Sequence, residues 1–541
     1  MTSLELKGVK NVSNEVGDLE LGELDDPSSR YGSFSSLRTS DIALLESNNG
    51  HEVPQGRHLG VFSTLVLFIS RIIGSGIFAT PSSIFVNSGG NAVIFLTIWF
   101  LAALMAFAGL YLFLEFGCLI PRSGGRKTFL EAAFNKPTMM VGATMTSFTV
   151  LTGMSVSNAI VFGKYVLYGL GFDPNYVNSE SMAGNYVGAV CILIIVAIHG
   201  VSVKRGVQLQ NLLGGLKISL IIFMTISGIY ALCLKDPFNQ GTSVFIGHLK
   251  RLEPVSSSSL TTAFIQAFFC FAGWDSVHAV TSEVKNPTRT LKIAGPLALF
   301  GCLACYLSLN FAYLKMFTYE EFKEAGPLAG SILFSKLFGE AFGRKFMTLS
   351  VALSSGSNLM VVIYGLSRMN QEAFREGLLP FSKMMASNKP FGAPFLSLIC
   401  CGILSVLWLC LLPPAGSAYN YLIAMEGYAN QIFLLLVAVG LLVYRKKNPD
   451  KKADIRASTP GIIFLILFSA YLVVGPFWGD QLETSLPHMP QYQITSLLMI
   501  LLCISFWFLK FQLIPRVCGY KLKSKWILLD DGLTIKKWEK C

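Results

Sequence analysis

Two short stretches of this sequence place glycine and polar residues inside long apolar runs, where such residues could bind a solute. The first, Arg71–Phe78 (RIIGSGIF), lies in the run 59–86, and the second, Phe268–Ser276 (FFCFAGWDS), lies in the run 259–281. Glycine packs no side chain and loses much backbone entropy in a helix, so both stretches predict a helix break. Broken backbone at membrane depth persists only beside protein or a water-filled cavity. We therefore expect a polar site inside the membrane; the alternative is a small-residue patch that lets a neighbouring helix approach closely.

The groups that each break frees indicate what it can bind. The first break exposes the N–H groups of Ser75, Gly76 and Ile77 at the positive end of a half-helix, which suits a carboxylate. The second frees carbonyls near Phe271 and Ala272, which suit an ammonium group. Two such sites that face each other would bind an amino acid. The predicted substrate-binding residues at the breaks are Ile73, Gly74, Ser75, Gly76, Ile77, Phe271, Ala272, Gly273 and Trp274.

Three ionisable residues in the apolar runs are candidates for coupling or gating. Lys217 lies about 12 Å into the run 209–233 at 1.5 Å per residue. A lysine at this depth costs about 2.5–3.5 kcal/mol, so it should face the protein interior with a partner. It is a candidate for proton coupling; the alternative is a permanent charge that joins the first and fifth helices. Asp275 is expected to cap the half-helix after its break, with proton coupling or contact with the substrate amine as alternatives. Glu426 is a candidate outer-gate or proton group.

These residues must be positioned by membrane-spanning helices. Of the 541 residues, 52% are hydrophobic and 14% charged, and the mean hydropathy is +0.55. Crossing about 30 Å of hydrocarbon takes roughly 20 apolar residues. The sequence therefore predicts an all-α polytopic membrane protein with 12 transmembrane helices in the lipid bilayer. The predicted spans are 59–86, 92–118, 139–168, 185–202, 209–233, 259–281, 293–316, 345–369, 395–413, 419–444, 459–478 and 490–514.

The basic residues indicate topology rather than nucleic-acid binding. The formal net charge is +11, but the lysines and arginines are spread over short loops. Most of them lie on the side that also carries both tails, so both termini are predicted to be cytoplasmic. The polar residues 1–56 predict a disordered tail, in which Lys7 and Lys10 are either candidate acceptors for ubiquitin-ligase machinery or simply solvated. The basic tail 516–541 is expected to lie on the anionic inner leaflet.

The two breaks occupy corresponding positions, in the first span of the first five and the first span of the next five. Paired interruptions of this kind are typical of inverted-repeat transporters with a site at the bilayer midplane. The expected fold is thus a 5+5 inverted repeat with broken helices 1 and 6 in a transporter domain 57–515. Its parts are repeat one (57–233), repeat two (259–444) and two extra helices (459–514).

Several motifs resemble a known family. The sequences GSGIF at 74–78, FAGW at 271–274 and E-x-x-N-P-x-R at 283–289 are similar to the amino acid–polyamine–organocation superfamily, in its L-type amino-acid transporter branch. The motif P-x-S-G-G at 121–125 fits as well, and the resemblance covers about 57–515. It implies a leucine-transporter-like fold.

Within that branch the chain looks most like the fungal methionine permeases. The similar stretches are EVPQGRHLGVFS at 52–63, VFGKYVL at 161–167 and DSVHAVTSE at 275–283. This resemblance implies a plasma-membrane importer of L-methionine, with cysteine or other neutral amino acids also possible, coupled to protons. It also implies that the ammonium of Lys217 takes the place of the sodium ion in sodium-coupled relatives.

The resemblance adds further candidate residues. A thioether side chain needs an apolar pocket with small neighbours, for which Ser155 and Asn158 are candidates together with Trp274 and the segment 354–357. Relatives usually carry a small or polar residue where Arg71 stands. We expect Arg71 to have a structural or gating role; the alternatives are direct binding of the substrate carboxylate and extension of the side chain to the cytoplasmic face.

Other classes of protein fit the sequence less well. No cofactor or metal site is predicted, because the C-x-x-C pair Cys302 and Cys305 lies inside an apolar run without histidine or acidic neighbours. No nucleophile motif or phosphate loop suggests an enzyme, and no ring of charge suggests a channel. The alternative function is an amino-acid receptor with little or no transport that signals through its cytoplasmic tails. Accumulation of substrate against its gradient would distinguish the two.

Overall fold

The computed structural model describes residues 60–120, 125–152, 154–234, 241–251, 253–276, 284, 286–389, 391–413, 417–479, 486, 489–528 and 534–540. The chain divides into two units, Met1–Gly56 and Arg57–Cys541. The first unit lies outside the described residues, and so do the predictions made for Lys7 and Lys10.

The first predicted span is interrupted where its glycines lie. Helix α4 (Val61–Ile72) is followed by Ile73, whose backbone is extended, and α5 (Gly76–Ala79) begins after Ser75. Helix α6 (Pro81–Asn87) follows directly, with Pro81 at its first position, where a missing N–H costs nothing. The sixth predicted span is interrupted as well: α14 (Ser257–Cys270) gives way to a turn and then to the short 3₁₀ segment η3 (Trp274–Ser276).

The remaining helical elements account for the other predicted spans and their connections. They are α7 (Ala92–Leu119), α8 (Arg126–Ala133), α9 (Met140–Leu151), α10 (Ser157–Gly169), η2 (Tyr176–Glu180), α11 (Ala183–Val201), α12 (Val203–Cys233), α13 (Gly241–Lys250), α16 (Pro287–Met316), α17 (Tyr319–Ala325), η5 (Gly326–Leu328), α18 (Ala329–Phe338), η6 (Phe342–Met347), α19 (Thr348–Arg375), α20 (Ser382–Met385), α21 (Phe395–Leu411), α22 (Ser417–Lys447), α23 (Thr459–Val474), η7 (Gly475–Phe477), α24 (Tyr492–Trp507), η8 (Phe508–Leu513) and α25 (Ile514–Val517).

Nine helices among the described residues are long and apolar enough to cross a membrane. The chain is therefore an all-α membrane protein over this region. The other three predicted spans correspond to shorter helices: 139–168 is divided into α9 and α10, 259–281 contains the 14-residue α14, and 395–413 contains the 17-residue α21. Helices α11 and α12 expose large apolar side chains, such as Leu193 and Ile226, as expected for surfaces that face lipid.

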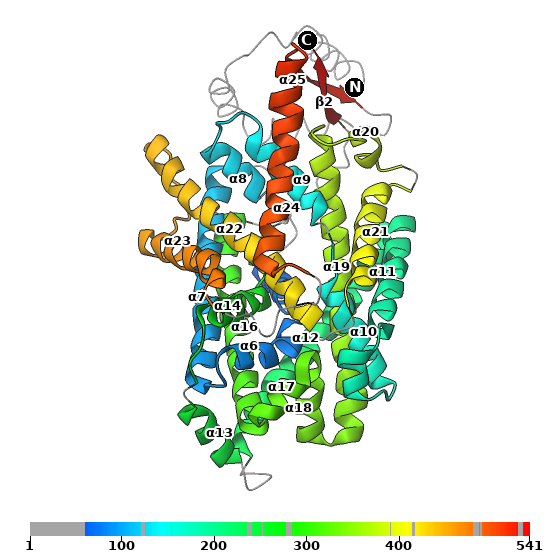
Figure 1. Cartoon of the computed structure of the whole chain (residues 1–541), viewed down its shortest axis with the longest axis vertical. Coiled ribbons are helices and arrows are strands. Elements are labelled where there is room, and N and C mark those ends of the chain that lie inside the picture. Colours follow the sequence, from blue (N-terminus) through cyan, green and yellow to red (C-terminus); the bar gives the residue numbers. More distant parts are fainter. Residues whose placement is uncertain are drawn as a thin grey trace, which may run out of the picture. The chain divides into compact units, whose positions relative to one another are not determined.

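The C-terminal segment differs from the prediction of a basic tail in an all-α protein. Strands β1 (Leu522–Leu528) and β2 (Thr534–Lys540) form an antiparallel hairpin in which Leu522 pairs with Lys540. In Figure 1 the hairpin lies at the same end of the helices as α8 and α20, whereas α13, α17 and α18 lie at the other end.

Candidate functional site

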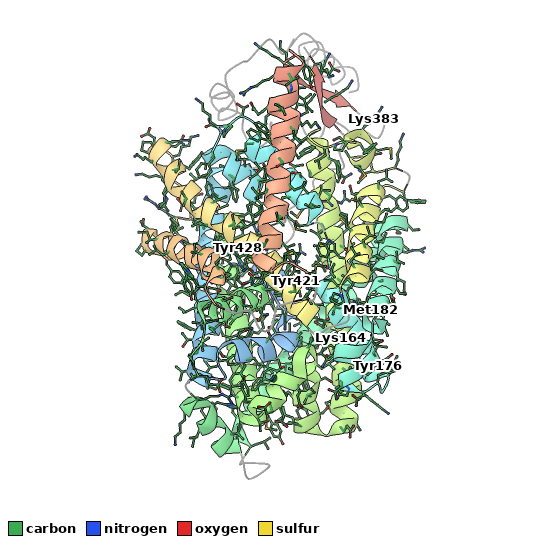
Figure 2. All side chains as sticks on the ribbon, in the orientation of Figure 1. Lys164, Tyr176, Met182, Lys383, Tyr421 and Tyr428 are labelled. Atoms are coloured by element: carbon green, nitrogen blue, oxygen red, sulfur yellow. The ribbon has the colours of Figure 1, made fainter. Side chains whose placement is uncertain are left out.

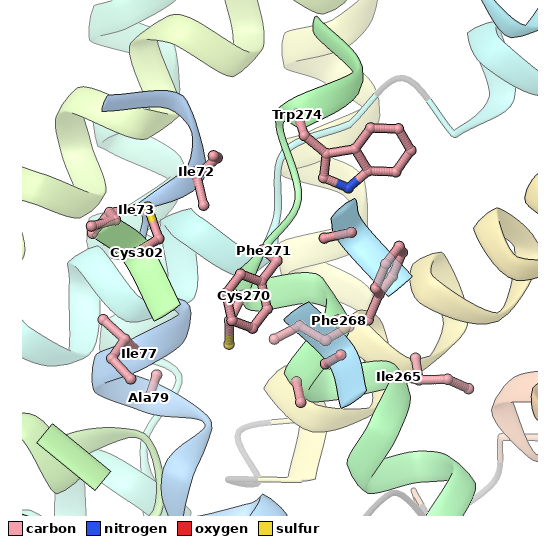
Figure 3. Packing of buried hydrophobic residues seen from close by; sticks show 14 of the residues in the cluster. Ile72, Ile73, Ile77, Ala79, Ile265, Phe268, Cys270, Phe271, Trp274 and Cys302 are labelled. Carbon is pink, nitrogen blue, oxygen red and sulfur yellow. The ribbon is translucent and has the colours of Figure 1, made fainter. Parts of the chain in front are cut away.

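The two helix breaks lie against each other. A Cβ added to Gly76 would lie 2.8 Å from the Sγ of Cys270, and one added to Gly273 would lie 3.0 Å from the carbonyl oxygen of Arg71. Gly273 also has φ +116°, which favours glycine. Figure 3 shows Ile73 and Ile77 of the first break on the same side of the core as Cys270 and Phe271. The segments that the sequence predicted to be unwound are thus in direct contact.

Each break presents unpaired backbone groups. Among the described residues, no acceptor is within hydrogen-bond reach of the N–H groups of Gly74, Ser75, Gly76 and Ile77. On the other side, the hydroxyl of Tyr306 donates to the carbonyl of Cys270 at 2.9 Å, which removes this carbonyl from the available set. The carbonyls of Phe271 and Ala272 receive no hydrogen bond from the described part of the chain. The arrangement can therefore accept an anion from one side and a cation from the other.

Asn158 connects the first break to two further helices. Its Oδ1 accepts hydrogen bonds from the Oγ of Ser75 at 2.9 Å and from the Nδ2 of Asn358 at 3.2 Å. A Cβ on Gly74 would lie 2.7 Å from that Nδ2, so α19 approaches the break closely. The sequence prediction included Asn158 but missed Asn358. Asn358 is the residue directly after the predicted segment 354–357, and nothing in its local sequence distinguished it from its neighbours.

The other two predicted pocket residues are both buried, in different surroundings. The N–H of Ser155 donates to the Oγ of Ser405 on α21 at 3.0 Å, while its own hydroxyl has no partner among the described residues. Trp274 packs into the core: its ring meets Phe113 edge-on with centroids 5.1 Å apart, and a Cβ on Gly109 would lie 2.6 Å from it. Its contacts are thus with α7 and with Phe268 of α14, whose ring centroid is 6.4 Å away, rather than with the unpaired groups of the breaks.

Lys217 has the interior partner that its depth requires. Its side chain is only 3% exposed, and its Nζ donates to the carbonyl of Ser70 at 2.8 Å. Because α4 ends at Ile72, this carbonyl is one of those that the helix end leaves without an intrahelical donor. A cation is also favourable at the negative end of a helix. The ammonium therefore stands at the carbonyl end of the first half-helix.

Charged residues from four elements gather beyond the second break. Arg126 of α8 pairs with Asp275 of η3, with 2.6 Å between Nη2 and Oδ2, and its Nη1 donates to the Oδ1 of Asn430 on α22 at 2.6 Å. Arg71 at the end of α4 is an electrostatic neighbour of Asp275, and Glu426 is one of Arg126. We define this group, including Asn430, as the charge cluster. The cap predicted for Asp275 cannot be seen, since the residues that would follow it lie outside the described ranges.

Glu426 on α22 is exposed although its neighbours along the helix are buried. Its side chain is exposed, although Phe433 and Val437 on the same face of α22 are buried and Asn430, one turn away, is half-buried. Its electrostatic neighbour is Arg126, on α8. The sequence prediction placed Arg126 among the loop charges only, because nothing in its local pattern distinguishes it from the other basic residues of the loops.

Two further observations complete the description. Lys164 on α10 is buried within the helices, and its Nζ donates to the carbonyl of Asn178 at 3.0 Å (Figure 2). No group of three or more potential metal ligands occurs among the described residues.

Comparison with known proteins gives consistent matches. A model of the amino acid permease family matches residues 59–509. The chain is 48% identical to the low-affinity methionine permease of Saccharomyces cerevisiae over 539 residues, 98% of each chain. It is 30% identical to the high-affinity methionine permease of the same yeast, which covers 89% of this chain and 84% of that protein. It is 26% identical to the large neutral amino acids transporter small subunit 2 of Mus musculus, over 80% of this chain and 79% of the relative.

These matches confirm the resemblance that the sequence motifs indicated. The family is one of transporters, not of enzymes. Because the family match runs from the first predicted span into the last, and the yeast permease aligns over nearly the whole length, this integral membrane protein belongs to the amino acid permease family.

Proposed function

We propose that the protein imports L-methionine across the plasma membrane by proton symport. The observation that carries this proposal is the contact between two helix breaks, one with unpaired N–H groups and the other with unpaired carbonyls. In this proposal the N–H groups of Ser75, Gly76 and Ile77 bind the substrate carboxylate. The carbonyls of Phe271 and Ala272 bind its ammonium group. The amino-acid backbone of the substrate is thus held in the same way whatever its side chain.

The choice of methionine rests on the names of two relatives, the low-affinity and high-affinity methionine permeases of yeast. The side chain would extend toward Ser155 and Asn158 on the third predicted span. Cysteine and other neutral amino acids are further candidate substrates, in line with the name of the mouse relative.

Lys217 is the proposed coupling residue. Its ammonium donates to the carbonyl of Ser70 at the end of α4, so loss of its proton would remove the charge that favours this contact and weaken the link between the first half-helix and the fifth span. Such a link between protonation and helix position is what a symporter needs, because substrate and proton must move in the same conformational cycle.

The proposed architecture is the leucine-transporter-like fold that the family implies. It has 12 helices, repeats at 57–233 and 259–444 and extra helices at 459–514, and it works by alternating access around the two breaks. Both tails would be cytoplasmic, with ubiquitin-ligase machinery acting on residues 1–56. The basic segment 516–541 would lie near the inner leaflet.

Uptake measurements test the proposal. Labelled methionine would be supplied to cells that lack their own methionine permeases, at two external pH values and with a protonophore. Uptake against the gradient that rises at acid pH and collapses with the protonophore is expected. Accumulation that is indifferent to both treatments would exclude proton symport. Specific binding without accumulation would instead support the receptor alternative.

A further inference from the structure

Arg126 joins parts of the chain that belong to both predicted repeats. Its two terminal nitrogens bond Asp275, just after the second break, and Asn430 on α22, each at 2.6 Å. The next residue, Lys127, pairs with Glu376 beyond the end of α19 at 3.0 Å. The first turn of α8 is therefore tied to three elements of repeat two.

The position of Asp275 makes the first of these contacts the important one. Asp275 lies two residues after Gly273, whose backbone touches the carbonyl of Arg71 at the end of the first half-helix. Arg126 on one side and Arg71 on the other are both electrostatic neighbours of this carboxylate. A movement of η3 away from α8 would therefore break the contact between Asp275 and Arg126 right beside the second break.

The exposure of the pair indicates that it can open. The side chains of Arg126 and Asp275 are 28% and 30% exposed, whereas those of Arg445 and Glu115 are 16% and 3% exposed. Breaking a buried ion pair is strongly unfavourable, because a charge is left without solvent or partner. A pair already in contact with water loses much less when it separates. The first pair has the properties of a reversible latch, and the second those of a permanent link.

We propose that Arg126 is the latch of the predicted cytoplasmic gate: it holds η3 against α8 and α22 and releases them when substrate leaves toward the cytoplasm. This inference rests on the proposed transport function, whose alternating access requires such a gate. In this role Arg126 is a positioning residue. It acts on the substrate path through Asp275 and the second break.

The native thiol of Cys270 provides the test. Cys270 is buried at the end of α14 and lies against Gly76, between the two breaks. Its modification by a membrane-impermeant thiol reagent would be followed by mass spectrometry of the full-length protein, in inside-out and right-side-out vesicles. We expect Arg126→Asp to raise the rate of modification from the cytoplasmic side about threefold to tenfold, the range expected for a partly exposed charge-assisted bond.

Two variants make the result specific. Asp275→Asn removes the charge of the other partner and should raise the rate to a similar extent, because the same ion pair is lost. Lys292→Glu changes the charge of an exposed residue on α16 for which the structure shows no partner among the described residues, and should leave the rate unchanged. If Arg126→Asp does not reach the membrane, Arg126→Gln replaces it, since it removes the charge at similar length.

The outcomes separate the latch from the transport function. An unchanged rate in folded Arg126→Asp, or an equal increase from both sides of the membrane, would overturn the latch. Because labelling requires no methionine flux, failure of uptake by the native protein would count against the transport function alone.

Discussion

Lys217 and Ser70 show how a single side chain can compensate for a broken helix. A carbonyl at a helix end inside the membrane needs a donor, and the Nζ of Lys217 supplies it at 2.8 Å. The same contact gives the lysine the partner that it needs at this depth. One hydrogen bond therefore offsets two unfavourable features, the end of α4 and the charge in the fifth predicted span.

We predict that Lys217→Ala reduces methionine uptake at least about tenfold, to near background, while the protein still reaches the cell surface. The reason is that the carbonyl end of α4 loses its only described side-chain donor and the proposed coupling group at once. Uptake and surface labelling would be measured in the same cells. Lys292→Ala is the matched control, because this lysine is exposed near the N-terminal end of α16. Normal proton-dependent uptake by Lys217→Ala would contradict the coupling role.

Gly76 packs directly against Cys270 where the two breaks meet. A Cβ here would lie 2.8 Å from the Sγ of Cys270 and 3.2 Å from its Cα, and the backbone cannot give way easily. We expect Gly76→Ala to reduce uptake by at least about tenfold through displacement of the two breaks. Gly215→Ala on α12 is the control, since a Cβ there meets nothing within 4 Å. Equal uptake by the two variants would show that the contact between the breaks is not needed for transport.

At the scale of elements, Glu115 links three parts of the chain. Its carboxylate accepts two hydrogen bonds from Arg445 of α22, at 2.8 and 2.6 Å, and one from the N–H of Ala457 before α23, at 2.6 Å. The group lies near the end of α7 and is almost fully buried. We therefore expect Glu115 to be a structural link rather than a proton carrier.

Glu115→Gln is therefore expected to lower the free energy of unfolding by about 3 kcal/mol, because Arg445 keeps its charge without a counterion. Thermal unfolding of the purified protein in detergent would measure the loss. Uptake per folded molecule should stay close to that of the native protein. If Glu115→Gln kept the stability of the native protein but took up methionine independently of protons, Glu115 would instead be part of the coupling machinery.

On the opposite side of the helices, Glu321 stabilises α17. It completes a capping box with Thr318 and pairs with Lys336 of α18 at 2.6 Å. Partial burial alone would raise the pKa of this carboxyl, but the hydrogen bonds from Lys336 and from the N–H of Thr318 outweigh it and hold the pKa below its ordinary value of 4.5. The folded state thus favours the ionised form.

Because the folded pKa is depressed, the stabilisation by Glu321 is present above the unfolded pKa and is lost as the pH falls through the folded one. The pair is partly exposed, so we expect the effect to be about 1 kcal/mol or less. The difference in melting temperature between the native protein and Glu321→Gln should shrink from about pH 7 to about pH 3.5. Glu320→Gln, at an exposed neighbouring position, should show no such difference. A difference in melting temperature that grows at acid pH would contradict the depressed pKa of Glu321 in the folded state.

At the scale of the whole molecule, much of the architecture was predictable from local composition. The apolar runs predicted the helices, and the glycines at 74, 76 and 273 predicted both interruptions, since these effects depend on a few adjacent residues. The family resemblance was confirmed by the match over residues 59–509. The count of twelve spans and the roles of the site residues stay predictions.

The remaining features depend on contacts between distant parts of the chain. Arg126 and Asn358 are unremarkable in their own segments, and only the packing of α8 and α19 brings them to the charge cluster and to Asn158. The C-terminal hairpin was missed because short strands rich in lysine resemble a solvated tail in composition, and their pairing is decided by the partner strand.

The hairpin also carries Trp538, a tryptophan whose fluorescence depends on its surroundings. The indole N–H of Trp538 donates to the carbonyl of Glu376 at 3.1 Å, and its ring lies edge-on to Phe511. The carboxylate of Glu376 in turn holds Lys127, the neighbour of Arg126. One of the chain's 7 tryptophans therefore stands at the end of a short series of contacts that begins at the charge cluster. If these contacts separate, the indole of Trp538 becomes more exposed to water and its fluorescence shifts to longer wavelength. Opening at this end of the protein can therefore be followed by intrinsic tryptophan fluorescence, without an attached dye.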